Sequence, residues 1–199
     1  MSPLTNSYLT ILGGLVLVFL SAQNPVQIGL LGALLNILLT FVLLFVLMYL
    51  QPGPLKWFVF GVFVLSFGQL LSSSEKRGVL SDVLLATVGI VLAVTALAFW
   101  DTGNRVIGWG SYLFAGLIGL VVARFAVLGA SFFNFEVEKT SNLLSVFASV
   151  LFAAYLAYDT QMMRVRISKT KGKHDYVEYA LGPFLDIVNL FVSLEDLTN

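Results

Sequence analysis

The sequence contains no cysteine and a single histidine, His174, which lies in a charged stretch. The lack of cysteine excludes disulfides, thiolate catalysis and cysteine-ligated metals. One histidine provides neither a histidine-rich metal site nor a serine–histidine pair inside an apolar segment. There is no glycine-rich phosphate loop, and the last apolar segment has no lysine for a retinal Schiff base. We therefore expect no enzymatic activity and no bound cofactor.

Charge is also scarce. Only 11% of the 199 residues are charged, against roughly a quarter in an ordinary soluble domain. The 11 basic residues balance the 11 acidic ones, which argues against the concentrated positive field that a nucleic-acid binder needs. Hydrophobic residues make up 58% of the chain, more than a soluble fold of this size could hide from water. The composition indicates an integral protein of the lipid bilayer.

Long apolar runs predict seven membrane helices, because a helix needs about 20 such residues to cross the hydrocarbon core. We predict one all-α transmembrane domain over residues 1–199, with helices at approximately 8–22, 28–50, 55–71, 79–100, 106–133, 142–163 and 176–194. No basic region precedes the first run, so we expect a retained helix and not a cleaved signal peptide. No internal repeat is evident, which disfavours an inverted-repeat transporter.

Lysine and arginine indicate the orientation, because they are in excess in cytoplasmic loops. If the N-terminus is cytoplasmic, seven of the 11 basic residues lie in cytoplasmic loops and three in the opposite loops. The seven are Lys56, Arg105, Arg164, Arg166, Lys169, Lys171 and Lys173, and the three are Lys76, Arg77 and Lys139. Most of the bias comes from a predicted polar linker, 164–175. We predict a cytoplasmic N-terminus, in an endomembrane of a eukaryote or virus or in a bacterial plasma membrane.

Asp186 is the best-placed candidate for function, because a charge deep in a bilayer costs several kcal/mol unless it is paired or hydrated. It lies in the middle of the last predicted helix. At helical spacing it shares a face with Tyr179, Gly182, Asn189 and Ser193. This polar stripe on an apolar helix should face the bundle interior. The alternative is a structural aspartate whose hydrogen bonds are satisfied locally.

Asp159 is a second intramembrane carboxylate, one turn after Tyr155 near the cytoplasmic end of the sixth predicted helix. Either it belongs to an ion pathway, or it is a helix-end carboxylate that pairs with Arg164 or Arg166. The sequence alone leaves both readings open.

Two further charges and several glycines lie within the predicted helices. Arg124 is either a structural ion-pair partner or an ion-path residue, and Asp82 is expected to be a first-turn residue favoured by the helix dipole.

Glycines within helices are expected to allow close helix packing. Examples are Gly61 and Gly68, and Gly116 and Gly119.

The two carboxylates lie in a pair of motifs, YLAYDTQ at 155–161 and ALGPFLDIVNLF at 180–191. Together these stretches resemble the signature of the transmembrane Bax inhibitor motif family. The resemblance implies six helices around a central seventh, and a calcium leak that responds to pH. In eukaryotes this activity is linked to lowered store calcium and to resistance to cell death. The two-aspartate sensor of the family carries over to Asp159 and Asp186.

A pair of carboxyl groups is physically suited to that role. In a low-dielectric site the two groups cannot both ionise easily, so they share a proton. Protonated, the pair can hydrogen-bond and hold two helices together. Deprotonated, it repels itself and attracts a hard cation such as calcium, which prefers oxygen ligands. Asp159 and Asp186 are therefore the expected calcium ligands, with Arg124, Tyr155, Asn189 and Asp82 as possible supporting residues.

The sequence departs from the family pattern at four places. Pro183 replaces a bulky residue, Asn36 and Leu85 stand near positions where relatives carry carboxylates, and only Lys56 is near the arginine that partners the pair in some relatives. These departures leave a second hypothesis, a non-conducting regulator of apoptosis that acts on membrane-protein partners. A proton-coupled transporter is a third.

Overall fold

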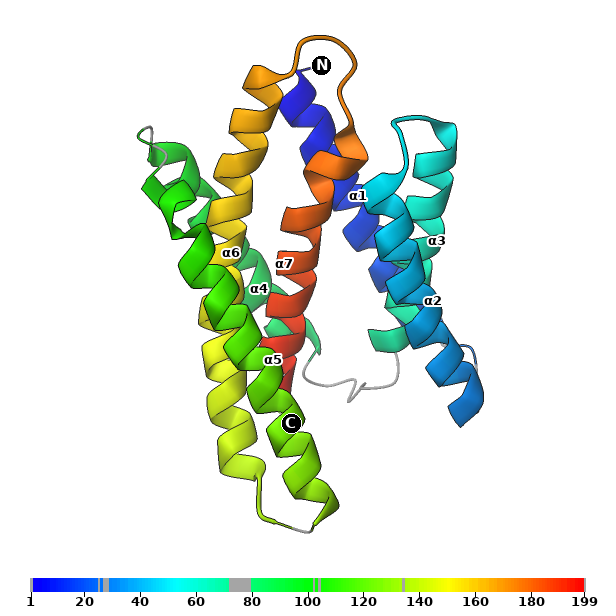
Figure 1. Cartoon of the computed structure of the whole chain (residues 1–199), viewed down its shortest axis with the longest axis vertical. Coiled ribbons are helices and arrows are strands. Elements are labelled where there is room, and N and C mark those ends of the chain that lie inside the picture. The colour runs from blue at the N-terminus through cyan, green and yellow to red at the C-terminus, as the bar shows by residue number, and fades with distance from the viewer. Residues whose placement is uncertain are drawn as a thin grey trace. The chain divides into compact units, whose positions relative to one another are not determined.

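The computed structural model describes residues 2–24, 26, 29–71, 80–101, 103, 105–133 and 135–198. Within this part of the chain there are seven α-helices and no strand (Figure 1). The helices are α1 (Pro3–Gln23), α2 (Leu30–Tyr49), α3 (Pro54–Leu71), α4 (Leu80–Trp100), α5 (Gly110–Phe132), α6 (Glu138–Lys169) and α7 (Tyr176–Asp196), with the 3-10 helix η2 (Arg105–Trp109) before α5. All seven are long and apolar enough to cross a membrane. The predicted all-α, seven-helix fold is confirmed.

Two helices extend well beyond the predicted bounds. The first begins at Pro3, because the Ser2 hydroxyl accepts a hydrogen bond from the Thr5 amide and proline is favoured in a first turn. The sixth continues to Lys169, so most of the predicted linker 164–175 is helical. Arginine and lysine are good helix formers, and they favour the C-terminal end of the helix dipole.

Some predictions fall on residues outside the described part of the chain. These are the helix starts placed at Ile28 and Val79, and the opposite-side basic residues Lys76 and Arg77.

The chain divides into two compact units, and α7 contributes to both. The first unit comprises Met1–Glu75 and Met163–Phe184, and the second comprises Lys76–Met162 and Leu185–Asn199. In the most apolar stretch of α7, 56% of the residues are buried, against 39% or less in each of the other six helices. Among the seven described helices, α7 therefore has the largest buried share.

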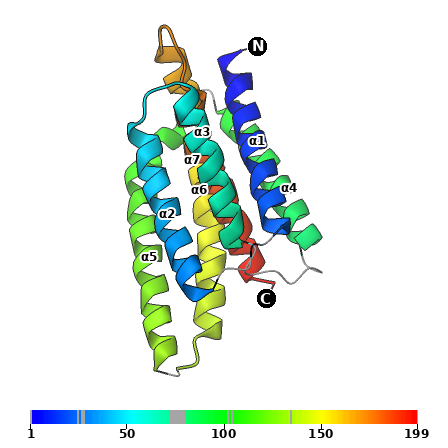
Figure 2. The same cartoon turned by 90° about the vertical axis from the view of Figure 1, so that its right-hand side faces the viewer.

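In the first unit, α3 packs against both α1 and α2 (Figure 2). A Cβ atom on Gly68 would lie 2.6 Å from the Val18 carbonyl oxygen, so only glycine allows this approach of α3 to α1. Beside it, the Ser21 hydroxyl donates to the Leu65 carbonyl at 2.8 Å, and the Gln69 amide donates to the Ser21 carbonyl at 2.8 Å. Hydrogen bonds and a glycine contact therefore join these two helices.

The N-terminal half of α7 packs into the first unit through aromatic rings. The Phe184 ring lies 5.9 Å from that of Phe60 and 6.2 Å from that of Phe63, both in edge-on geometry. Gly14 on α1 leaves room for the Phe184 ring, which would be 3.1 Å from an added Cβ atom. The helix continues through Pro183, although proline supplies no amide to the turn before it.

A buried ion pair joins the start of α3 to the start of α7. The Lys56 ammonium lies 2.6 Å from Asp175 Oδ2, and the two side chains are only 2% and 9% exposed. The other oxygen, Asp175 Oδ1, accepts a hydrogen bond from the Glu178 amide and so caps the N-terminus of α7. One carboxylate therefore both begins α7 and fixes it to α3.

In the second unit, α5 and α6 lie side by side over a core of Leu113, Leu120, Ala148 and Leu151 (Figure 1). A Cβ atom on Gly116 would lie 3.1 Å from the Leu151 side chain. The predicted close packing is thus confirmed at Gly68 and Gly116. It is wrong at Gly61 and Gly119, where no atom of the described residues lies within 4 Å of such a Cβ atom.

We predict that Lys56→Met lowers the free energy of unfolding by about 3–5 kcal/mol, because it leaves the Asp175 carboxylate buried without its counter-charge. Unfolding of the purified protein in detergent measures the loss. Adding Asp175→Asn should recover part of it, because asparagine keeps the N-cap but carries no charge. A double variant less stable than Lys56→Met alone would contradict this account.

Candidate functional site

The two motif aspartates meet within the second unit. The carboxyl group of Asp159 on α6 is hydrogen-bonded to that of Asp186 on α7. Asp186 is buried, with 6% of its surface exposed, whereas Asp159 is partly buried. A hydrogen bond between two carboxyl groups requires a proton on one of them. The geometry is therefore that of a carboxyl pair sharing a proton inside an apolar bundle.

One oxygen of the pair is left over. Asp186 Oδ2 is buried and has no hydrogen-bond partner among the residues that the structure describes. A buried oxygen without a donor is costly. A proton, a water molecule or a cation would satisfy it.

Tyr155 is the nearest of the predicted supporting residues. It lies one turn before Asp159 on α6 and is close enough to interact electrostatically with both carboxyl groups. Its ring centroid is 6.5 Å from that of Phe152. Tyr155 thus places a phenol beside the pair.

Of the two arginines considered as ion-pair partners of Asp159, Arg164 and Arg166, the second pairs with another carboxylate. Arg166 lies 3.7 Å from Glu178, an ion pair on the first unit. Lys56, the residue nearest in sequence to the family's arginine, forms its ion pair with Asp175. Sequence position alone could not reveal this, since 119 residues separate Lys56 from Asp175.

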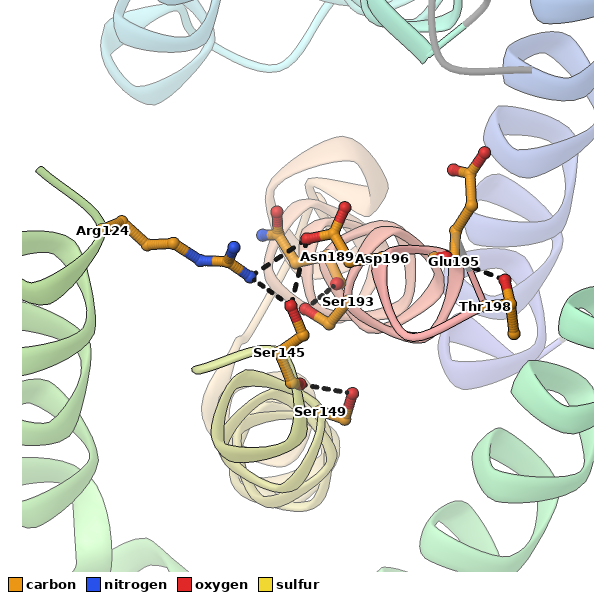
Figure 3. A network of polar contacts seen from close by, with 8 residues as sticks. All are labelled: Arg124, Ser145, Ser149, Asn189, Ser193, Glu195, Asp196 and Thr198. Atoms are coloured by element: carbon orange, nitrogen blue, oxygen red, sulfur yellow. Dashed lines mark hydrogen bonds and ion pairs between the residues drawn. The ribbon is translucent and has the colours of Figure 1, made fainter. Parts of the chain in front are cut away.

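Arg124 forms the second polar centre of this unit (Figure 3). Its guanidinium donates to the Ser145 hydroxyl at 2.8 Å and lies 3.0 Å from Asp196 Oδ2. Ser145 is fully buried, and the Arg124 and Asp196 side chains are 34% and 41% exposed. The structure therefore supports the ion-pair reading of Arg124 and adds Asp196 as its partner.

Sequence reasoning missed Asp196, because the last helix was predicted to end at 194. A signal was present, since Asp196 continues the stripe of Asp186, Asn189 and Ser193 at helical spacing. Along that stripe, the Ser193 hydroxyl donates to the Asn189 carbonyl at 2.8 Å. Figure 3 shows Asn189, Ser193 and Asp196 on α7 near Ser145 and Ser149 on α6.

Asp82 lies in the first turn of α4 and is exposed, where a carboxylate is favoured by the helix dipole.

Within the described residues, no group of three or more histidine, cysteine, aspartate or glutamate side chains could hold a metal ion. The carboxyl pair alone supplies too few oxygens for a closed calcium site, which takes six to eight.

The last residue of the YDTQ motif has a separate role. The Gln161 amide donates to Asp101 Oδ2 at 2.9 Å, just after α4 ends at Trp100. This hydrogen bond, joined by those from the Arg105 and Gly103 amides, outweighs desolvation and holds the pKa of the Asp101 carboxyl below its usual range. Gln161 therefore fixes the end of α4 against α6.

Fold and site together define a polytopic helical membrane protein with a carboxyl pair between two of its helices. The family model described as "Inhibitor of apoptosis-promoting Bax1" matches residues 1–198, and the chain belongs to this family. Protein LIFEGUARD 2 of Arabidopsis thaliana is 29% identical over 153 residues, which cover 73% of this chain and 60% of that protein.

Relatives outside plants are similarly distant. Bax inhibitor 1 of Saccharomyces cerevisiae is 30% identical over 149 residues, 68% of this chain but only 46% of the yeast protein. A protein of Helicobacter pylori without an assigned function is 28% identical over 172 residues, 70% of this chain and 69% of its own. The chain thus spans about half to two thirds of the relatives it matches.

We predict that Asp101→Asn lowers the melting temperature at pH 7 and that the difference from the wild type shrinks at pH 3. The pKa of Asp101 is lowered by folding, so its stabilisation is present above the pKa of the unfolded chain and is lost as the pH falls through that of the folded state. Thermal unfolding in detergent, at pH 7 and at pH 3, measures the melting temperatures of the variant and the wild type. In a Gln161→Leu background, Asp101→Asn should have a smaller effect at pH 7. An equal effect in both backgrounds would show that the hydrogen bond does not matter.

Proposed function

We propose that this protein is a calcium-permeable leak channel whose opening is controlled by the proton shared between Asp159 and Asp186. The hydrogen bond between these two carboxyl groups, with Asp186 almost fully buried, is the observation that carries the proposal. While the proton is shared, the bond holds α6 to α7. Removal of the proton leaves two like charges that repel each other and attract a cation.

The surrounding polar groups fit a pathway better than a storage site. Calcium would meet the pair, then the amide and hydroxyl groups of Asn189, Ser193 and Ser149 along α6 and α7. Such a sparse set of oxygens binds a cation weakly, which favours passage over retention. No part of this activity requires a cofactor or an enzymatic step.

A regulator that conducts nothing is the second candidate, in line with the apoptosis-related description of the family. Two positions where relatives of the motif family carry carboxylates favour it. The Asn36 amide donates to the Ser66 carbonyl at 3.1 Å, a helix-to-helix contact, and Leu85 is 70% exposed. Neither side chain offers a charge to a cation.

We expect Asp186→Asn or Asp159→Asn to flatten most of the pH dependence of calcium entry into liposomes that contain only this protein. Asparagine preserves the shape and can hydrogen-bond, but it cannot exchange the proton. Because the two groups act as a unit, the double variant should add little to either single change. The measurement is the rate of calcium entry from pH 5 to pH 8, reported by a calcium-sensitive dye trapped inside the liposomes.

Glu178→Gln is the matched control, because it neutralises an exposed carboxylate on the same helix and should leave the pH profile unchanged. Additive effects of the two aspartate variants would mean independent sites. No flux from folded wild-type protein would remove the channel and favour the regulator.

We further propose that the N-terminus and the basic segment 164–173 lie in the cytoplasm, since this places most lysine and arginine there. The chain has no cysteine, so single cysteines report topology directly. A membrane-impermeant thiol reagent should label Ser168→Cys from the cytoplasmic side only. Glu136→Cys, beyond the other end of α6, should be labelled only from the opposite side. The reverse pattern would invert the topology.

A further inference from the structure

Two glycines of the first unit face open space. Nothing lies within 4 Å of a Cβ atom built on Gly13 of α1 or Gly61 of α3, whereas Gly14 and Gly68 are in tight contact. Glycine weakens a helix relative to alanine. At Gly13 and Gly61 this weakening is not offset by closer helix packing, and the missing side chains instead leave room.

That room is an apolar groove between α1 and α3, of about 860 Å³. Its walls include Leu9, Leu12, Val16 and Phe60, with Gly13 and Gly61 among its lining residues. Polar groups of Asn6 and Thr10 also line it, together with Trp57 and Tyr176. The groove therefore combines a long apolar surface with a few polar groups, as an amphipathic ligand requires.

A second pocket, of about 590 Å³, adjoins the groove and shares Trp57 and Tyr176 with it. This pocket is lined by the Lys56–Asp175 ion pair, by Lys173 and His174, and by the connection between α2 and α3. Lys173 is exposed and donates one hydrogen bond, to the Pro52 carbonyl at 3.2 Å. An ammonium group has three protons, so Lys173 keeps donors for a ligand.

The chain around this pocket is strongly basic. Lys56 is paired with Asp175, and Arg166 with Glu178. Among the described residues, no ion pair involves Lys169, Lys171 or Lys173, and all three are exposed. A positive φ of 111° at Gly172 turns the chain between the last two. Lys173 therefore lines the pocket without an ion-pair partner in the described part of the chain, and Lys169 and Lys171 lie just before it in the chain.

We propose that the groove and the basic pocket together bind one phospholipid with an anionic headgroup. An acyl chain would lie along Gly13 and Gly61, and the phosphate would face Lys173 and the neighbouring lysines. Basic pockets between membrane helices are typical sites for such headgroups. This site lies entirely in the first unit and does not depend on the carboxyl pair.

Trp57 provides a reporter, because it lines both cavities. In a Trp100→Phe/Trp109→Phe background it is the sole tryptophan, and brominated acyl chains quench it on contact. The protein would be placed in phosphatidylcholine vesicles containing either brominated phosphatidylglycerol or brominated phosphatidylcholine at equal mole fraction. We expect about a fivefold preference for the anionic lipid for each lysine engaged.

Two variants with matched controls test the two halves of the site. Lys173→Gln should reduce the anionic preference about fivefold, whereas Lys139→Gln, an exposed lysine at the start of α6, should not. Gly61→Leu should reduce quenching by both lipids, because the new side chain starts from a Cβ position with nothing within 4 Å and takes up room in the groove. Gly119→Leu makes the same change at an equally open glycine of α5 and should have no effect.

Equal quenching by both lipids would overturn the headgroup assignment. Unchanged quenching in a folded Gly61→Leu variant would overturn the groove. Loss of quenching as the protein-to-lipid ratio rises would show that a second copy of the chain covers this face, which also overturns the proposal.

Discussion

A carboxylate inside a membrane needs a partner, and this constraint governs α7. Three aspartates mark the beginning, middle and end of this helix, at 175, 186 and 196. Each meets a group from a different helix: Lys56 of α3, Asp159 of α6 and Arg124 of α5. The first and third partners are cations, so those contacts are ion pairs. The middle partner is another acid, and only a proton can hold that contact.

This arrangement explains how one helix can combine rigidity with response. Ion pairs fix both ends of α7, and the aromatic contacts of Phe184 fix its N-terminal half. The contact at Asp186 is the one of the three that depends on a proton. The proposed lipid site occupies the first unit, whereas the carboxyl pair lies in the second. A lipid and a proton would thus act on separate parts of the chain.

The fold could be predicted because apolar runs of membrane length are separated by prolines and charges, and hydropathy alone distinguishes them. The carboxyl pair was accessible through its two motifs, which lie close together in the sequence. Contacts between distant residues were not accessible. The sequence does not indicate that Lys56 binds Asp175, which lies 119 residues away. The sequence predicts the same close helix packing at Gly61 and at Gly68, although Gly61 faces a groove and Gly68 faces a carbonyl oxygen. Asp196 was missed because a polar helix end carries no hydropathy signal.

The length of α6 has a consequence for the bilayer around it. Its 32 residues rise by about 48 Å at 1.5 Å per residue, while the hydrocarbon core is only about 30 Å thick. About half of this excess is the basic end from Arg164 to Lys169, which is better placed among headgroups than among acyl chains. A thicker membrane would draw this overhang inward and a thinner one would tilt the helix. The end of α6 that carries Asp159 would move with it, so membrane thickness itself becomes a variable to which the carboxyl pair is exposed.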